Sequence, residues 1–454
     1  MRGAMSVNPV DAAVGASILL VPSLVLGVLK KDVVTASLAT FATVVAAALL
    51  QSKAGAVFRA APVGAWTGVQ ISLLIVAAIY FYKAYESLGY VGRLRESLTS
   101  GKGVEVFLAV YFSGFIESMS GYGVSPAVTA PILAGLGVGA VEATLLPMFG
   151  HVWAVPFASL GVPTLVLSQV TGADAESLAA FTARILFAPL VLILALALLV
   201  GRARRRAALV ALASSALLPL FAVAGTMVAA LTGFAGLVLG LLATQGLAAT
   251  RRTLRLVSPY VMLVASVIAL GALGARGLLW VALTTVAVSL AVQLAHRRFS
   301  REAAVSALSM TKRSVVAVIL FSAVAEVSKQ AGYTVALAEV VAVTAGKAYL
   351  PLVPVVAVLG AFITGSATNS NLLLGLLQKT FGELAGVDQS LVLALQNAGA
   401  GLGSGIAPAK ISVAASTTGG KRVEAEVFRR VVPVIALLVA PLSILAVLAC
   451  MAKA

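Results

Sequence analysis

The stretch that decides the fold is SGFIESMSGYG, residues 113–123, together with its counterpart GAFITGSATNS, residues 360–370. Each lies inside a longer apolar run, 103–138 or 350–378, and interrupts it with Gly, Ser or Asn. When the two stretches are aligned, Phe115 falls on Phe362 and Glu117 on Thr364. Broken backbone at membrane depth must be buried in protein or line a wet cavity, because lipid offers no hydrogen bonds. The pair therefore predicts two re-entrant hairpins.

The composition of the chain places these stretches in a membrane. Of 454 residues, 61% are apolar and only 11% are charged, whereas soluble domains carry about a quarter charged residues. This excludes a soluble enzyme, a disordered chain and a soluble nucleic-acid binder. A bilayer crossing needs about 20 apolar residues, so the length predicts an all-α polytopic membrane protein with roughly 11 to 14 transmembrane elements.

The positions of the basic residues indicate how the chain is oriented across the membrane. Lys and Arg number 32 against 16 Asp and Glu, and they cluster between apolar runs, as at 30–31, 202–206, 312–313 and 421–422. This is the positive-inside pattern, so the expected surroundings are the lipid bilayer of the plasma (inner) membrane, and nucleic acid is not an expected partner. A single cysteine, Cys450, excludes a disulfide framework.

The order of elements suggests an internal repeat. The unit 65–200 reappears as 314–450, and the charges start hairpin 103–138 inside and hairpin 350–378 outside. Inverted repeats with broken helices are the signature of secondary transporters. We therefore predict four parts: scaffold spans 1–64, a first repeat 65–200, middle spans with an interfacial helix 201–313, and a second repeat 314–454. The alternative is that Gly and Pro merely ease helix packing.

Polar side chains at and near the breaks are the candidate substrate ligands. Two hairpin tips would aim helix N-termini at one point, and these ends suit an anion such as a carboxylate. The alternative is that the side chains cap the broken helices themselves. The candidates are Ser118, Ser120, Tyr122, His151, Thr364, Ser366, Asn369, Ser370, Asn371, Gln396 and Lys410.

Of three ionisable residues at membrane depth, Glu117 and His151 are candidates for proton coupling and Lys410 is a candidate substrate ligand. Glu117 has no charged counterpart in the second repeat, and a carboxylate there is costly, so proton coupling is one interpretation and a permanent pair with Lys410 is the other. Lys410 could hold a substrate carboxylate or snorkel to the cytoplasmic face. His151 could donate to substrate or relay a proton, or it could make an ordinary core hydrogen bond.

At these residues the sequence resembles the L-lactate permease family. The resemblance rests on residues 115–126, on GAFITGSATNSN at 360–371 and on GSGIAPAK at 403–410. It implies uptake of small monocarboxylates (L-lactate, D-lactate and glycolate) by proton symport, and a possible homodimer with a moving transport domain. The chain is shorter than typical members, and it has Ser118, Met119 and Tyr122 where the family pattern has small residues and Phe.

Rival functions remain at this stage. A sodium-coupled carrier would use oxygens of residues 368–371, and an anion channel would not need two inverted hairpins. A membrane enzyme is not expected, because no metal-spaced cluster of His and acidic residues appears and no nucleophile–base pair can be named. Neither a cofactor nor a metal is expected.

Overall fold

A computed structural model describes residues 8–98, 103–121, 123–200, 205–275 and 277–452 of the chain, and over these residues it is helical, without strands. Nine helical stretches of this described part are long and apolar enough to cross a membrane. Two bent pairs, α8–α9 (63°) and α10–α11 (44°), raise the number to eleven. The prediction of an all-α polytopic membrane protein is confirmed.

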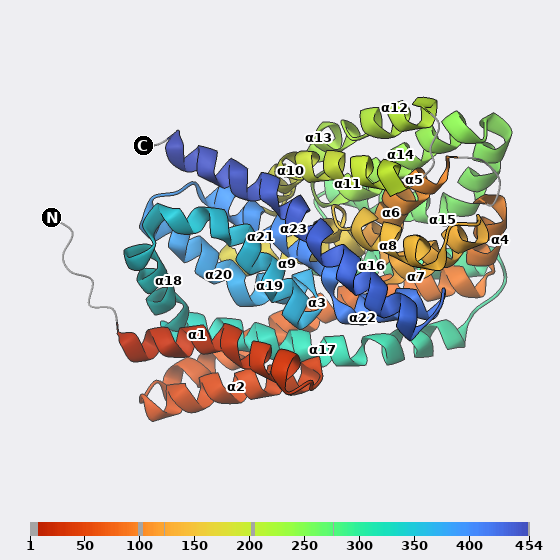
Figure 1. Cartoon of the computed structure of the whole chain (residues 1–454). Coiled ribbons are helices and arrows are strands. Elements are labelled where there is room, and N and C mark those ends of the chain that lie inside the picture. Colours follow the sequence, from red (N-terminus) through yellow and green to blue (C-terminus); the bar gives the residue numbers. More distant parts are fainter. Residues whose placement is uncertain (1–7, 99–102, 122, 201–204, 276, 453–454) are drawn as a thin grey trace.

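An outer group of long helices forms a framework at one side of the molecule. In Figure 1, α17 runs along this side with α1 and α2 beside it, and α3 packs along α17 and α16. The framework helices are α1 (Pro9–Ser23), α2 (Val33–Leu50), α3 (Ala54–Ser87), α15 (Leu247–Ala272), α16 (Leu278–Ala295), α17 (Arg301–Gln330) and α18 (Tyr333–Thr344).

Small residues let α3 and α17 approach closely. Gly64 and Gly68 lie one helical turn apart on α3, and a Cβ at either position would meet the backbone of α17 at 2.5 Å, at Ser322 O and Ile319 Cα respectively. Glycine at a four-residue spacing is a common device for bringing two membrane helices into contact. This close contact requires glycine at both positions.

Two predicted boundaries between parts of the chain fall inside helices. The boundary between residues 313 and 314 lies within α17, which is continuous because no Gly or Pro interrupts residues 301–330. The expected boundary between residues 64 and 65 falls inside α3, which runs unbroken from Ala54 to Ser87.

The predicted breaks are present, and at both of them the chain folds back on itself. The first hairpin consists of α6 (Ser113–Ser120) and α7 (Val124–Gly135), separated by Gly121 and Gly123 with φ of 64° and 79°. The second consists of α19 (Val353–Thr364) and α20 (Ala367–Ala385), separated at Gly365 with φ of 71°. Such positive φ values favour glycine. A serine hydroxyl joins the arms of each: Ser125 donates to Ser113 O and Ser370 to Ala357 O.

Two interrupted helices accompany the hairpins. The first is α8 (Ala140–Gly150), a short 3₁₀ segment, and α9 (Ala158–Thr171), with left-handed backbone at 159–161. The second is α21 (Gln389–Gly403), a 3₁₀ turn at 404–406, and α22 (Pro408–Ser416). Together with the hairpins they form the core described below. The remaining described helices are α4 (Tyr90–Leu98), α5 (Glu105–Phe107), α10 (Ala175–Ile185), α11 (Phe187–Val200), α12 (Arg205–Ser214), α13 (Leu217–Leu220), α14 (Val228–Thr244) and α23 (Lys421–Met451).

Candidate binding cavity

A cavity of about 610 Å³ lies where the two hairpin tips and the two interrupted helices meet. Its walls include Glu117 and Gly121 of the first hairpin, residues 362–369 of the second, and Ser404 and Lys410 of the second interrupted helix. A group of ionisable residues also lines it, from the loop before α2 and from α17: Lys30, Lys31, Asp32 and Arg313. Because these are loop and helix residues outside the apolar core, they mark the mouth of the cavity.

The most deeply buried charges in this cavity face each other. Lys410 Nζ donates to Glu117 Oε1 at 3.2 Å, and the two side chains are 9% and 1% exposed. The other carboxylate oxygen, Oε2, is buried without a partner. Gly123 leaves room for the lysine stem, since a Cβ there would lie 3.1 Å from Lys410 Cγ. Lys410 does not snorkel to the cytoplasmic face, because its ammonium is buried against the Glu117 carboxylate.

His151 lies behind the ion pair and is not among the residues that line the cavity. Its ring is fully buried, and Nδ1 lies 2.7 Å from Pro147 O one turn earlier. Nε2 has no partner. The ring is within electrostatic range of both Glu117 and Lys410. The core hydrogen bond considered from the sequence is therefore present, and it leaves one ring nitrogen unused.

Most hydroxyls at the hairpin tips bond to their own helices. Ser118 and Ser120 donate to Phe115 O and Ile116 O, both at 2.7 Å, and neither lines the cavity. Thr364 donates to Gly360 O at 2.7 Å but also lines the cavity. Ser366 also lines the cavity, and its hydroxyl accepts a hydrogen bond from the Asn369 N–H at the start of α20. Tyr122 lies outside the described residues.

Three further candidates form a buried network of amides instead of a cavity wall. Asn371 Nδ2 donates to Asn397 Oδ1 at 2.9 Å and to Pro163 O at 3.0 Å. Gln396 Nε2 donates to Ser370 Oγ and to Asn371 Oδ1, both at 3.2 Å. These bonds join α20, α21 and α9.

Asn397 extends this network to the first repeat. Its Nδ2 donates to Thr164 Oγ1 at 2.8 Å and lies 3.3 Å from Thr182 Oγ1. On the side of α9 away from the first cavity, a second cavity of about 800 Å³ is lined by Gln70, Gln169 and residues 173–176. Through these bonds the amide network joins α20 and α21 of the second repeat to α9 and α10 of the first.

Sequence reasoning missed two serines on the cavity wall. Ser404 Oγ is buried without a partner, and Ser159 Oγ donates to Ser120 O at 2.9 Å. Both residues lie at the interruptions of their helices, and the alignment of the repeats places them at equivalent positions. The signal that could have identified Ser404 is its place between Gly403 and Gly405, because a polar side chain in a Gly-rich break can face a cavity.

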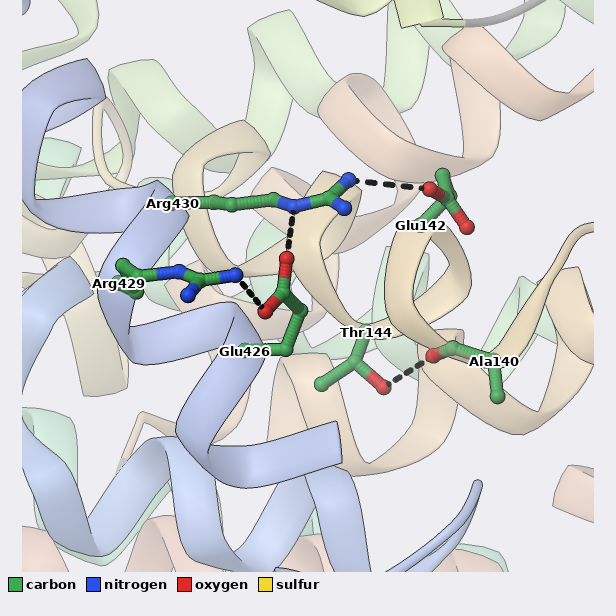
Figure 2. A network of polar contacts seen from close by, with 6 residues as sticks. All are labelled: Ala140, Glu142, Thr144, Glu426, Arg429 and Arg430. Atoms are coloured by element: carbon green, nitrogen blue, oxygen red, sulfur yellow. Dashed lines mark hydrogen bonds and ion pairs between the residues drawn. The ribbon is translucent and has the colours of Figure 1, made fainter. Parts of the chain in front are cut away.

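A polar network outside the cavity joins α8 to α23. Figure 2 shows Arg430 between Glu426, at 2.6 Å, and Glu142, at 3.2 Å. Arg429 also contacts Glu426. Glu142, Arg429 and Arg430 are more than a third exposed, so solvent screens these pairs and they contribute little to stability. No metal-binding group of three or more His, Cys, Asp or Glu occurs among the described residues.

Known proteins similar to the chain agree on one family. The family model described as L-lactate permease matches residues 12–260 and 254–452. An L-lactate permease of Halalkalibacterium halodurans is 24% identical over 434 residues, covering 80% of this chain and 81% of that protein.

Other relatives have higher sequence identity over shorter segments. An L-lactate permease of Streptococcus iniae is 31% identical over 121 residues, 26% of each chain. A glycolate permease of Escherichia coli (strain K12) is 34% identical over 118 residues, 25% of this chain and 21% of that one. The chain thus matches about a quarter of the length of these relatives.

Proposed function

The chain belongs to the L-lactate permease family, and from this premise we propose that it is a secondary transporter that carries small monocarboxylates, such as lactate and glycolate, together with protons. The single observation that carries the proposal is the buried Glu117–Lys410 ion pair, which lies on the wall of a cavity between the two hairpins. An ammonium at that position is the natural partner of a substrate carboxylate.

The ion pair supplies a reason for proton coupling. While Glu117 is ionised it neutralises Lys410, and a substrate carboxylate entering the cavity would bring a second negative charge to one ammonium. In a poorly hydrated site two negative charges beside one ammonium have an unfavourable electrostatic free energy, since charge interactions are stronger there than in water. Protonation of Glu117 removes the competing charge and frees Lys410 for the substrate. One proton therefore enters with each carboxylate, and the loaded site keeps the charge of the empty one.

We propose that the cavity faces the cytoplasm. Lys30, Lys31 and Arg313 lie at its mouth, and positively charged segments remain on the cytoplasmic side of membrane proteins. In this proposal the buried amide network around Asn371 and Asn397, which joins α20, α21 and α9, holds the opposite side closed. Alternating access then requires the hairpins and interrupted helices to move against the framework helices, as in other transporters built from inverted repeats.

Sodium coupling has weaker support. Ser370 Oγ and Asn371 Oδ1, which would have to coordinate the ion, already accept hydrogen bonds from Gln396. A sodium site needs several free oxygens, and only Asn369 Oδ1 of this segment is buried without a partner. The sodium carrier therefore has no specific observation in its favour.

Uptake of labelled L-lactate into proteoliposomes tests the proposal. We expect saturable uptake that an inward proton gradient drives above equilibrium and that sodium at fixed pH does not change. Protein-free liposomes are the necessary control, because undissociated lactic acid crosses lipid unaided. Uptake that follows sodium and ignores the proton gradient would contradict proton symport, and a non-saturating current would indicate a channel.

A further inference from the structure

Two polar atoms on the cavity wall lack partners. Asn369 is 4% exposed and its Oδ1 makes no hydrogen bond, while Ser404 is fully buried and its Oγ makes none. Both residues line the same cavity as Lys410. A buried polar atom left unpaired destabilises the folded protein, and folded proteins rarely retain such atoms unless a ligand or water completes them.

Asn369 and Ser404 belong to segments that pack against each other at the cavity. Helix α20 contacts α21, Gln396 donates to Ser370, and Ala367 and Ala400 belong to one apolar cluster, so the two helices run antiparallel through this region. One further turn along α21 brings Ser404 to the level of the hairpin break at residues 364–366. Asn369 lies in the first turn after that break. The two residues therefore line the cavity beside the second hairpin tip.

We infer that Asn369 and Ser404 recognise the 2-hydroxyl group of a 2-hydroxycarboxylate whose carboxylate is held by Lys410. This inference rests on the proposed function and deepens it. The substrate hydroxyl donates to Asn369 Oδ1, an acceptor, and accepts from the Ser404 hydroxyl, a donor. An unsubstituted acid of the same chain length would leave both protein atoms unpaired, and sites built around a hydroxyl reject analogues that lack it.

Competition for labelled L-lactate uptake measures this preference directly. In proteoliposomes of the full-length protein, unlabelled L-lactate should compete at least tenfold better than propionate. In Ser404→Ala and Asn369→Leu, each of which removes one hydrogen bond, this preference should fall about tenfold. Lactate should compete less well because it loses a hydrogen bond, and propionate should compete at least as well as before because it leaves one fewer protein atom unpaired. Ser328→Ala is the matched control, because Ser328 Oγ is also buried without a partner but lies on α17 away from the cavity.

A second arm uses only the wild-type protein and so does not depend on the folding of a variant. In 2-methoxypropionate the ether oxygen remains but the O–H donor to Asn369 is gone, so this acid should compete as poorly as propionate. Competition equal to that of lactate would overturn the inference. So would an unchanged lactate-to-propionate preference in both variants while transport persists. A wild-type protein that carries neither acid would instead overturn the proposed function, and this inference with it.

Discussion

Lys410 Nζ lies 3.2 Å from Glu117 Oε1, and this contact joins the start of α22 to the last turn of α6, 293 residues apart in sequence. Both side chains are almost completely shielded from solvent. A buried pair of this kind contributes little net stability, but removing one partner leaves an uncompensated charge. The pair is therefore poised to exchange one carboxylate for another.

The first prediction concerns stability. Lys410→Met should lower the free energy of unfolding by about 3 to 5 kcal/mol, because it strands the Glu117 carboxylate in the core. Adding Glu117→Gln should recover most of that loss, since the double variant buries no charge. Thermal unfolding of both purified variants in the same detergent measures the difference. Equal losses in the single and double variants would show that the two residues do not form a coupled pair.

The second prediction concerns substrate affinity. Glu117→Gln leaves Lys410 unneutralised, so the half-saturating lactate concentration should be no higher than in the wild type. In the double variant Glu117→Gln with Lys410→Met, it should rise about tenfold or more, because a hydrogen bond between charged groups is lost. Equilibrium exchange at varied lactate concentration measures both values. An unchanged value in the double variant would remove Lys410 from the binding site.

The third prediction uses the exposed ion pair as a contrast. Glu142→Gln breaks the contact with Arg430 shown in Figure 2, where both side chains are more than a third exposed. The free energy of unfolding should hardly change, because solvent screens such pairs. Thermal unfolding at low and high salt checks this. A loss as large as that of Lys410→Met would contradict the assignment of the main electrostatic cost to the buried pair.

The fourth prediction concerns the amide network. Asn397→Leu removes the acceptor of Asn371 and the donor to Thr164, although these two residues keep their other hydrogen bonds, to Pro163 O and Pro156 O. The unfolding free energy should fall by about 0.5 to 1.5 kcal/mol for each hydrogen bond lost. Gln389→Leu is the control, because its amide bonds only to exposed Glu383. If the two variants lose the same stability, the network does not brace the core.

The breaks in the helices could be predicted because their signal is local. Gly121, Gly123 and Gly365 adopt positive φ, which other residues avoid, and polar side chains beside them mark backbone that cannot face lipid. The continuity of α17 could not be predicted in the same way. Its first half is more charged than its second half, a change that also fits two separate helices, although no Gly or Pro interrupts residues 301–330.

The roles of individual polar residues depend on partners distant in sequence. Asn371 bonds to Pro163 and Asn397, so its amide braces helices and does not line the cavity. Ser118 and Ser120 could equally have faced a substrate or their own helix, and the structure has them bonded to their own helix. The sequence predicted functional roles for Glu117 and Lys410 but left open whether the two residues pair with each other. Ser404 lacked any distinctive local pattern apart from its flanking glycines.

The most direct measurement of the central claim compares two transport modes in Glu117→Gln, a variant that mimics the protonated carboxyl. External labelled lactate should still exchange for internal unlabelled lactate, while an inward proton gradient should no longer drive accumulation. Glu105→Gln, which alters another acidic residue outside the cavity, should retain both modes. Gradient-driven accumulation by Glu117→Gln at the wild-type level would contradict the account.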